Sequence, residues 1–472
     1  MKEYCGVVGI YGNKNAAQLV YLALYALQHR GEESAGIVSF DKKKIYQHKG
    51  MGLVGDIFTP ESLKKLKGPL AIGHVRYSTT GSSIAKNVQP LLINHKKGFI
   101  AVAHNGNLTN SVDLRNELED TGSILQTTMD SELILHYLVK DHQNNYSGKI
   151  LPIASRLEGA YSFVLMINDA IYALRDPHGF RPLCIGKMDG GYIVASETCA
   201  LDMVQATYVR DVEPGEVVII DKGGLHSMKQ PEAKRKAFCI FEYIYFARPD
   251  SNIFTQSVYL TRKNLGRALA REHPADADLV MPIPDSGTYA ALGYAEESKI
   301  PLEMAFVRNH YIGRTFIQPS QLIRDFKVKV KLNPVRDALK GKKIAIIEDS
   351  IVRGTTSKGR VRALRQAGAK EIHMRVSCPP LVSPCFYGID FPTKKELIAS
   401  DHSIEEIREF IGVDSLKYLS LEGMLGSMML PKEEFCTACF TGDYPTKICK
   451  PPSKKALEKR SCPGPKKGPD PF

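Results

Sequence analysis

The sequence predicts two domains of different fold class, α+β in the first half of the chain and α/β in the second. The 472 residues correspond to two or three domains of ordinary size. Short β-rich segments with few helices fill the first half, whereas strands and helices alternate regularly in the second. A polar stretch with a Gly-Gly pair and a basic cluster, residues 221–237, separates the two patterns, and we expect the domain junction there.

In the first half we expect one clear helix and several strands. Apolar residues at helical spacing predict a helix over residues 16–28, and the chain turns at Gly31. The predicted strands cover residues 70–79, 98–106, 161–167, 192–197 and 216–220.

In the second half the elements follow one another as in an open α/β sheet. A strand–helix alternation in which the strands are nearly continuously apolar predicts a parallel sheet covered by helices. The predicted helices cover residues 258–272 and 357–368, and the predicted strands cover residues 278–283, 342–349 and 371–377.

The charge balance does not favour nucleic acid as a partner. The formal net charge is +12, but residues 445–472 alone contribute +6, in a Pro-rich stretch without apolar periodicity that we expect to be a disordered tail. The alternative to an enzyme is a regulator that binds nucleic acid through its excess positive charge. No run of 18 apolar residues and no secretory leader is present, so we expect no membrane partner and a cytoplasmic location.

Residues 344–356 form the most specific motif in the chain. An apolar strand ends in Glu348 and Asp349, and a short loop with Gly354 leads into a helix. Ligands bind at the carboxyl ends of strands in such sheets, and a helix N-terminus suits a phosphate group. Paired carboxylates there can hold Mg²⁺ or ribose hydroxyls. A simpler interpretation is that Asp349 and Ser350 only cap the helix.

Cys5 is a candidate nucleophile near the start of the chain. By composition alone it is a buried strand thiol, because cysteine is among the most buried residue types. If Met1–Tyr4 were removed, Cys5 would carry a thiol and a free α-amine with a pKa near 8, which is a suitable intramolecular base.

Three further segments contain groups that fit an amino-acid substrate. Arg76 suits a carboxylate, Asp130 suits an ammonium group, and Asn105 with Gly106 can form an oxyanion hole. Each also has a structural interpretation: a strand-end salt bridge, a helix cap and an Asn-Gly turn, respectively.

Four cysteines form a further candidate site. Cys436 and Cys439 are spaced as C-x₂-C, and Cys239 and Cys385 lie far away in the sequence. The residues alone leave a redox pair, a zinc site and an iron–sulfur cluster open.

From Cys5 to about Thr446 the chain resembles the amidophosphoribosyltransferase family, also called glutamine phosphoribosylpyrophosphate (PRPP) amidotransferases, and within it the iron–sulfur branch. The resemblance implies an N-terminal nucleophile hydrolase αββα sandwich over residues 5–235, after a leader of residues 1–4. A type I phosphoribosyltransferase α/β domain with the iron–sulfur cysteines would cover residues 236–444. The matching stretches are CGVVGIYG, LQHRGEESAGI, GHVRYST, AHNGNL, DPHGFRPL, ASETCALD, EPGE, FEYIYFARPDS, GRTFIQPSQ, EDSIVRGTTS, PCFYGID and CTACFTGDYPT.

The resemblance implies an activity and a set of glutamine-site residues. Glutamine would acylate Cys5 and release ammonia, which would attack PRPP to give 5-phosphoribosylamine in the first step of de novo purine (IMP) biosynthesis. Transfer of ammonia to another sugar phosphate is the enzymatic alternative. Cys5, Asn105 and Gly106 would be catalytic, and Arg76, Thr79 and Asp130 would bind glutamine.

The same resemblance implies ligands in the second domain. Mg²⁺ would be held by Ser286, Glu348 and Asp349, and a 4Fe–4S cluster by Cys239, Cys385, Cys436 and Cys439, with Cys378 as an alternative ligand. Purine nucleotides would be feedback inhibitors of a homo-oligomer, a homotetramer in our prediction. PRPP would be bound by Asp285, Ser286, Arg308, Arg314, Lys331, Ser350, Arg353, Gly354, Thr355 and Thr356.

Two features depart from the family pattern. The leader is short and carries Glu3-Tyr4 before the nucleophile, so autocatalytic removal of Met1–Tyr4 is an expectation. Glu348-Asp349 stands where the family has paired aspartates, which keeps both charges.

Overall fold

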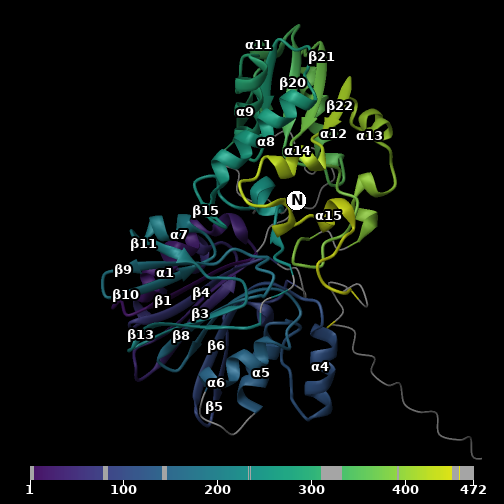
Figure 1. Cartoon of the computed structure of the whole chain (residues 1–472). Coiled ribbons are helices and arrows are strands. Elements are labelled where there is room, and N and C mark those ends of the chain that lie inside the picture. Colours follow the sequence, from purple (N-terminus) through teal and green to yellow (C-terminus); the bar gives the residue numbers. More distant parts are fainter. Residues whose placement is uncertain are drawn as a thin grey trace, which may run out of the picture.

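The structure is a computed structural model of the chain and describes residues 5–77, 83–140, 146–231, 233, 235–309, 332–390, 393–448 and 457. A strand-rich part built from the first half of the chain lies below a part built from the second half in Figure 1. The sequence predictions for residues 1–4, Thr79, Arg314 and Lys331 lie outside the described residues.

The first part contains two antiparallel sheets. Among the described residues, one has seven strands in the order β11-β9-β10-β1-β4-β2-β3 and the other has six in the order β13-β12-β8-β7-β6-β5. The first sheet consists of β1 (Gly6–Tyr11), β2 (Ser34–Phe40), β3 (Ile45–Met51), β4 (Leu70–Arg76), β9 (Cys184–Met188), β10 (Gly191–Ala195) and β11 (Thr207–Asp211). The second consists of β5 (Leu91–His95), β6 (Gly98–Leu108), β7 (Gly159–Ile167), β8 (Ala170–Arg175), β12 (Glu216–Asp221) and β13 (Gly224–Lys229).

The two sheets pack face to face, and helices cover their outer faces. Val7 and Ile72 of the first sheet share a core with Val164 and Ile171 of the second. Outside the first sheet lie α1 (Ala16–Ala26) and α7 (Thr198–Met203), and outside the second lie α4 (Ser111–Asp120), α5 (Glu132–Lys140) and α6 (Tyr146–Ala154). This arrangement is the αββα sandwich predicted for the first half.

The second part is built on a parallel sheet. In the described part of the chain it has four strands in the order β17-β20-β21-β22, and every neighbouring pair is parallel. The predicted α/β class is therefore confirmed. The strands are β17 (Leu279–Pro282), β20 (Lys343–Glu348), β21 (Glu371–Val376) and β22 (Ser415–Tyr418), and the helices are α8 (Val258–Glu272), α9 (Thr288–Ser298), α11 (Arg336–Leu339), α12 (Thr355–Gln366), α13 (Ile404–Ile411) and α14 (Leu421–Gly426).

Short elements complete the fold. A parallel pair of two-residue strands, β14 (Phe238–Cys239) and β23 (Phe435–Cys436), joins the beginning of the second part to its end. The other short elements are α2 (Val54–Ile57), α3 (Pro60–Lys65), η1 (Gln28–Arg30), η2 (Ala85–Asn87), η3 (Glu242–Phe246), β15 (Asn252–Ile253), β16 (Gln256–Ser257), β18 (Phe306–Arg308), β19 (Leu332–Pro334), η4 (Lys394–Glu396), η5 (Ile398–Ser400), η6 (Lys432–Glu434) and α15 (Ala438–Thr441).

The predicted elements occur, with shifted ends and one correction. The helix predicted at residues 357–368 begins earlier, at Thr355, because Gly354 adopts φ +71° and allows the turn from the loop into the helix. The polar stretch 221–237 contains β13, which pairs with β12. The sandwich therefore extends to Lys229, and only the later part of this stretch can be a junction.

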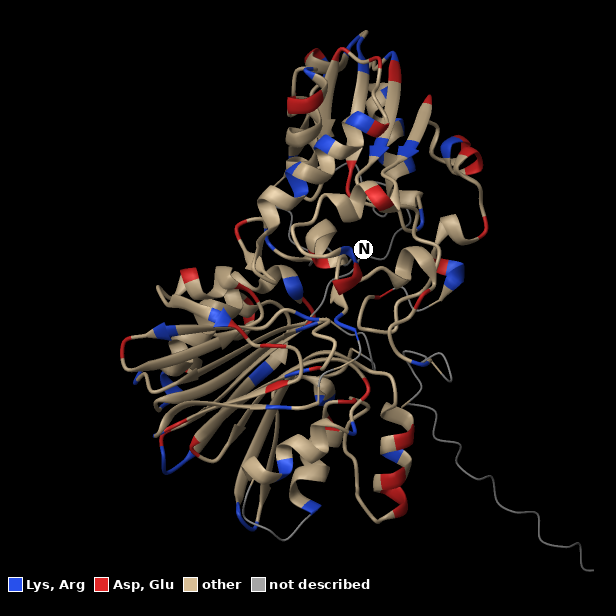
Figure 2. Cartoon of the chain, in the orientation of Figure 1, with Lys and Arg blue, Asp and Glu red and all other residues tan. Residues whose placement is uncertain are grey.

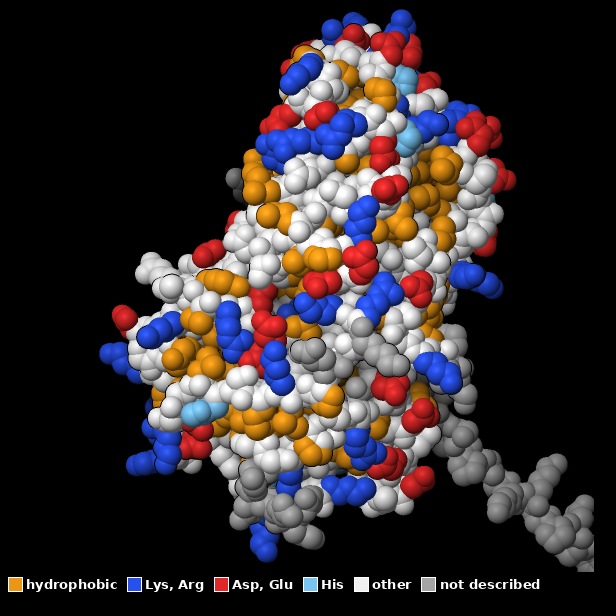
Figure 3. Space-filling view, viewed as in Figure 1, with side chains coloured by type: hydrophobic (Ala, Val, Ile, Leu, Met, Phe, Trp, Pro, Cys, Tyr) orange, Lys and Arg blue, Asp and Glu red, His pale blue; other side chains and the backbone are white. Residues whose placement is uncertain are grey.

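Charged side chains of both signs are interspersed over the surface. Figure 2 shows Lys and Arg beside Asp and Glu in both parts, and the face in view in Figure 3 shows the same mixture. No helix among the described residues is both long and apolar enough to cross a membrane.

Helices α8 and α9 approach each other closely through two glycines. A Cβ atom on Gly266 would lie 1.9 Å from the carbonyl oxygen of Ala290, and one on Gly293 would lie 2.0 Å from the carbonyl oxygen of Lys263. Both obstacles are backbone atoms, so a larger residue would force the helices apart.

We therefore expect Gly266→Ala to lower the free energy of unfolding by about 1–3 kcal/mol, as overpacking generally does. Gly426→Ala is the matched control, because a Cβ atom on Gly426 of α14 would have no other heavy atom within 4 Å. The melting temperatures of the two variants, followed by circular dichroism, test this. Equal melting temperatures would contradict the close approach of α8 and α9.

Candidate functional site

Cys5 lies immediately before β1, which is the central strand of the seven-stranded sheet. Because Gly6 pairs with Val75 of β4, Cys5 lies beside the end of β4. The Cys5 thiol donates a hydrogen bond to the carbonyl oxygen of Tyr77 at 3.4 Å, and only 6% of the residue is exposed. Burial raises the pKa of the Cys5 thiol to about 11, so the thiol is protonated at neutral pH with residues 1–4 attached.

Arg76, the last residue of β4, places a guanidinium group beside Cys5. Its Nη1 lies 3.7 Å from Oε2 of Glu33, its Nη2 lies 3.3 Å from the sulfur of Met129, and the side chain is fully buried. The charge of Arg76 acts on the pKa of Cys5. A buried guanidinium at this position can bind a carboxylate in bidentate fashion.

Asp130, just before α5, adds a buried carboxylate. Its Oδ2 accepts a hydrogen bond from the backbone N–H of Leu108 at 2.9 Å, and its Oδ1 lies 3.4 Å from Nδ1 of His104. Burial acts to raise the pKa of Asp130, but His104 and backbone N–H donors hold it below its ordinary value. Asp130 also acts electrostatically on Cys5. The structure therefore brings Cys5, Arg76 and Asp130 into one buried site, which we call the Cys5 site.

Asn105 and Gly106 lie on β6, in the sheet that faces β1 and β4. The Asn105 side chain is fully buried, and neither its oxygen nor its nitrogen has a hydrogen-bond partner among the described residues. Gly106 has φ +150°, and a Cβ atom there would lie 2.1 Å from the carbonyl oxygen of Ala160, so only glycine fits. A buried amide without a partner is costly unless it serves a ligand.

Ser286 and Asp349 meet at the carboxyl edge of the parallel sheet. Strands β17 and β20 are neighbours, so the segments that follow them lie side by side. Ser286 Oγ donates to Asp349 Oδ2 at 2.5 Å, and Ser350 Oγ donates to the other carboxylate oxygen. We call this group the Asp349 site.

Glu348 is the second carboxylate of the Asp349 site. Burial raises its pKa to about 7, against the opposing effect of Arg360 of α12, whose Nη1 donates to Oε2 of Glu348 at 2.8 Å. After Asp349 the chain passes through residues 350–354 into α12, whose first-turn N–H groups have no partner within the helix. This edge thus combines carboxylates with a helix N-terminus that suits phosphate.

The structure describes some of the other residues predicted to bind PRPP. Arg308 of β18 forms an ion pair with Asp285, and Arg353 forms one with Glu396; both arginines are exposed. Gly354, Thr355 and Thr356 form the start of α12.

Four cysteines, which we call the cysteine quartet, gather where β14 pairs with β23. Cys239 lies opposite Cys436 in that pair, Cys439 lies in α15, and Cys385 accepts a hydrogen bond from the backbone N–H of Tyr387 at 3.4 Å. All four thiols are free. Burial raises the pKa of each, and electrostatic interaction with other members of the quartet raises those of Cys239, Cys436 and Cys439 further.

The cysteine quartet offers four thiol ligands, the number that a 4Fe–4S cluster binds. Among the described residues, no group of three or more His, Cys, Asp or Glu side chains is placed to hold one metal ion. A 4Fe–4S cluster spaces its four thiolates farther apart, since irons and sulfides lie between them. The number, burial and chemistry of these donors fit such a cluster. Cys378 is also buried, but its Sγ donates to the carbonyl oxygen of Pro379.

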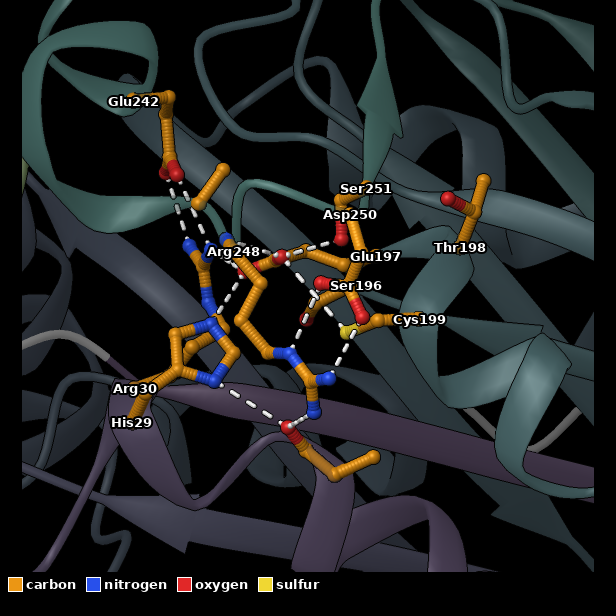
Figure 4. Close-up of polar contacts among 12 residues, drawn as sticks. His29, Arg30, Ser196, Glu197, Thr198, Cys199, Glu242, Arg248, Asp250 and Ser251 are labelled. Atoms are coloured by element: carbon orange, nitrogen blue, oxygen red, sulfur yellow. Dashed lines mark hydrogen bonds and ion pairs between the residues drawn. The ribbon is translucent and has the colours of Figure 1, made fainter. Parts of the chain in front are cut away.

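Sequence reasoning missed several residues around these sites. Glu33, His104 and Arg360 each contact a predicted residue. Arg30 and Glu242, which Figure 4 shows, form a buried ion pair, and Arg30 also contacts Cys5. Their ion-pair partners lie between 12 and 212 residues away in the sequence. The only sequence signal was that four of them lie within stretches that carry the family resemblance. Such a resemblance identifies segments of the chain, but it does not show which residues contact each other.

Known proteins similar to this chain match it over nearly its whole length. A family model described as a glutamine amidotransferase domain matches residues 74–203. The chain is 51% identical to amidophosphoribosyltransferase 2, chloroplastic, of Arabidopsis thaliana, over 94% of this chain and 80% of that protein. It is 50% identical to the amidophosphoribosyltransferase of Methanothermobacter thermautotrophicus, over 95% of this chain and 96% of that protein.

Two solved structures are also similar throughout. The glutamine PRPP amidotransferase of B. subtilis, complexed with ADP and GMP, has a TM-score of 0.89 and 48% identity, covering 94% of this chain and 98% of that one. A structure described as the allosteric regulatory enzyme of purine biosynthesis has a TM-score of 0.90 and 49% identity, covering 94% of this chain and 97% of that one. With Cys5, Arg76 and Asp130 in one buried site and this similarity across both parts, the chain belongs to the amidophosphoribosyltransferase family.

Proposed function

We propose that this chain releases ammonia from glutamine at Cys5 and transfers it to PRPP, giving 5-phosphoribosylamine, pyrophosphate and glutamate. This is the reaction of its family and the first step of purine biosynthesis. The observation that supports Cys5 is the buried group around it. Arg76 and Asp130 are complementary to the carboxylate and the ammonium group of an amino acid.

In the glutaminase half-reaction, the α-amine of Cys5 takes the thiol proton once Met1–Tyr4 has been removed. The thiolate attacks the amide carbon of glutamine, while the Asn105 amide and the Gly106 N–H stabilise the oxyanion. Collapse of this intermediate breaks the C–N bond, the α-ammonium of Cys5 gives its proton to the leaving nitrogen, and ammonia departs from a thioester on Cys5. Water then hydrolyses the thioester, which releases glutamate and restores the thiol. Arg76, Asp130 and Thr79 hold the amino-acid end of the substrate.

The pH dependence of Cys5 reactivity tests the role of its α-amine. With Met1–Tyr4 attached, the pKa of about 11 means that thiolate, and with it the rate of alkylation by iodoacetamide, should rise about tenfold per pH unit up to about pH 11. In a chain that begins at Cys5, the rate should level off near pH 8, the ordinary pKa of an α-amine. Mass spectrometry of the Cys5 peptide measures both profiles, and identical profiles would contradict this base.

In the transferase half-reaction, the Asp349 site holds PRPP. Ser286, Glu348 and Asp349 would hold Mg²⁺, which when bound neutralises charge on the pyrophosphate leaving group. The residues proposed to bind PRPP are Asp285, Ser286, Arg308, Arg314, Lys331, Ser350, Arg353, Gly354, Thr355 and Thr356, of which the cationic side chains, the hydroxyl groups and the backbone N–H of Gly354 suit its phosphates. Ammonia from the Cys5 site then attacks C1 of the ribose.

Separate sites for the two half-reactions predict separable activities. Cys5→Ala should abolish glutamine-dependent formation of pyrophosphate and leave the ammonia-dependent reaction within about twofold of wild type, because Cys5 is not part of the Asp349 site. Assays of pyrophosphate with glutamine or with ammonium chloride measure this. Loss of both activities in folded protein would contradict two separate sites. Ser350→Ala is the converse control and should impair both activities.

We also propose that the cysteine quartet holds a 4Fe–4S cluster. Support comes from its four thiols, three of them buried and that of Cys385 partly buried, which the fold gathers from the beginning, the later half and the end of the second part of the chain. When bound, such a cluster would join these segments covalently through iron–sulfur bonds.

Metal analysis of anaerobically purified protein tests the cluster. We expect about four iron atoms per chain. Cys385→Ser should lose most of this iron, whereas Cys378→Ser should keep it, because Cys378 is the matched buried cysteine outside the quartet. Stoichiometric zinc in the wild-type protein would overturn the assignment.

The regulatory and cellular features expected from the family resemblance belong to this proposal as well. A relative of similar structure was solved with ADP and GMP, and purine nucleotides are the feedback inhibitors that we propose here. We further propose a homo-oligomer, a tetramer, located in the cytoplasm.

A further inference from the structure

A buried ion network lies directly next to Cys5 and connects it to the second part of the chain. Figure 4 shows its members Arg30, Glu197 and Glu242. Arg30, in η1 after α1, donates from Nε to the carbonyl oxygen of Cys5 at 3.0 Å. Its two Nη atoms donate to the two carboxylate oxygens of Glu242, at 3.0 and 2.8 Å. The Arg30 side chain is 1% exposed and that of Glu242 is fully buried. The guanidinium therefore touches the nucleophilic residue and a carboxylate of the other part at once.

Arg30 remains charged in this environment because of its two carboxylate partners. Burial acts to lower the pKa of Arg30, but Glu242 and Glu197 hold it above its ordinary value. Glu197 contacts Nη1 of Arg30 and also accepts a hydrogen bond from Ser251 Oγ at 2.7 Å. The guanidinium can therefore hold one orientation, with its Nε directed at Cys5.

Glu242 is shared with a second buried arginine. Arg181 donates from Nη1 to Oε1 of Glu242 at 3.2 Å. It also donates to the carbonyl oxygen of Tyr387, at 2.6 Å from Nη2 and 3.2 Å from Nε. Tyr387 in turn donates its backbone N–H to Cys385 of the cysteine quartet. Hydrogen bonds thus run without interruption from the cysteine quartet through Glu242 to Cys5.

The network does not include the groups that would bind glutamine. Among the described residues, the Arg30 side chain donates its hydrogen bonds to Cys5, Glu242 and Glu197, whereas Arg76 and Asp130 approach Cys5 from β4 and from the residues just before α5. A change at Glu242 should therefore disturb the placement of the nucleophile more than the binding of substrate.

We propose that Glu242 is a positioning residue for Cys5, which through Arg30 fixes the main chain that carries both the thiol and the α-amine. This inference rests on the proposed role of Cys5 as the glutaminase nucleophile. Removing the charge of Glu242 would leave two buried guanidinium groups sharing a neutral amide, and breaking a buried pair in this way is strongly unfavourable. Arg30 would then lose its fixed orientation. A displacement of about 1 Å at a reacting group can lower a rate by about 100-fold.

The test compares Glu242→Gln with Glu216→Gln in the full-length protein. Glu216 is an equally buried carboxylate that accepts hydrogen bonds from both Nη atoms of Arg210 at 2.7 Å, apart from the Cys5 network. The probe is 6-diazo-5-oxonorleucine, an electrophilic glutamine analogue, and mass spectrometry follows alkylation of Cys5. For Glu242→Gln we expect the maximal alkylation rate to fall about 10- to 100-fold, with the half-saturating concentration of probe unchanged. Glu216→Gln and the ammonia-dependent activity of both variants should match wild type.

The outcomes separate this inference from the proposed function. Wild-type protein that is not alkylated at Cys5 would overturn the proposed nucleophile itself. A wild-type alkylation rate in Glu242→Gln, or an equal loss in Glu216→Gln, would overturn only the positioning role. If Glu242→Gln does not fold, Arg181→Lys carries the test. Lysine cannot contact Glu242 and Tyr387 through a planar fork, so a fall of about twofold to tenfold is expected, and an unchanged rate overturns the inference.

Discussion

The pairing of β1 with β4, in a sheet pressed against β6 and β7, is the constraint on which the Cys5 site depends. Both faces of β1 are buried, so its position is set from two sides. A Cβ atom on Gly9 would lie 2.7 Å from Val164 of the opposite sheet, which shows how closely the two sheets approach. Cys5 and Arg76 lie at adjacent ends of the paired strands, so the packing of the two sheets also fixes their positions.

Burial acts to raise the pKa values of Cys5, Asp130 and Glu348, and the partners of each group decide the outcome. Burial dominates at Cys5 and raises the pKa of the thiol, because Arg76 offsets only part of the cost of an anion. At Asp130 the neighbouring donors lower the pKa by more than burial raises it, so the carboxylate stays ionised and can bind a cation. Glu348 lies between these cases, with a pKa of about 7 and Arg360 as its partner. The same low dielectric environment thus contains a neutral thiol at Cys5 and an ionised carboxylate at Asp130.

The two parts of the chain depend on each other through buried polar contacts and the cysteine quartet. Strands β14 and β23 bring the beginning and the end of the second part together, and Glu242 follows β14 by three residues. Glu242 receives arginines from the sandwich, so the segment that begins the second part also completes the surroundings of Cys5. A charged network of this kind contributes less to stability than to geometry, because desolvation offsets much of its Coulombic attraction.

The amino-acid sequence alone was enough to predict the two fold classes, the strands with strong apolar patterns and the segments that carry candidate chemistry. It did not identify β2, whose small residues Ser34, Ala35 and Gly36 show no alternation because both faces are buried. Local patterns also could not pair Arg30 with Glu242, which lies 212 residues away, or show that the Asn105 amide has no partner among the described residues. Only the tertiary structure decided these features, because pairing and burial depend on long-range packing, whereas periodicity and motifs are properties of neighbouring residues.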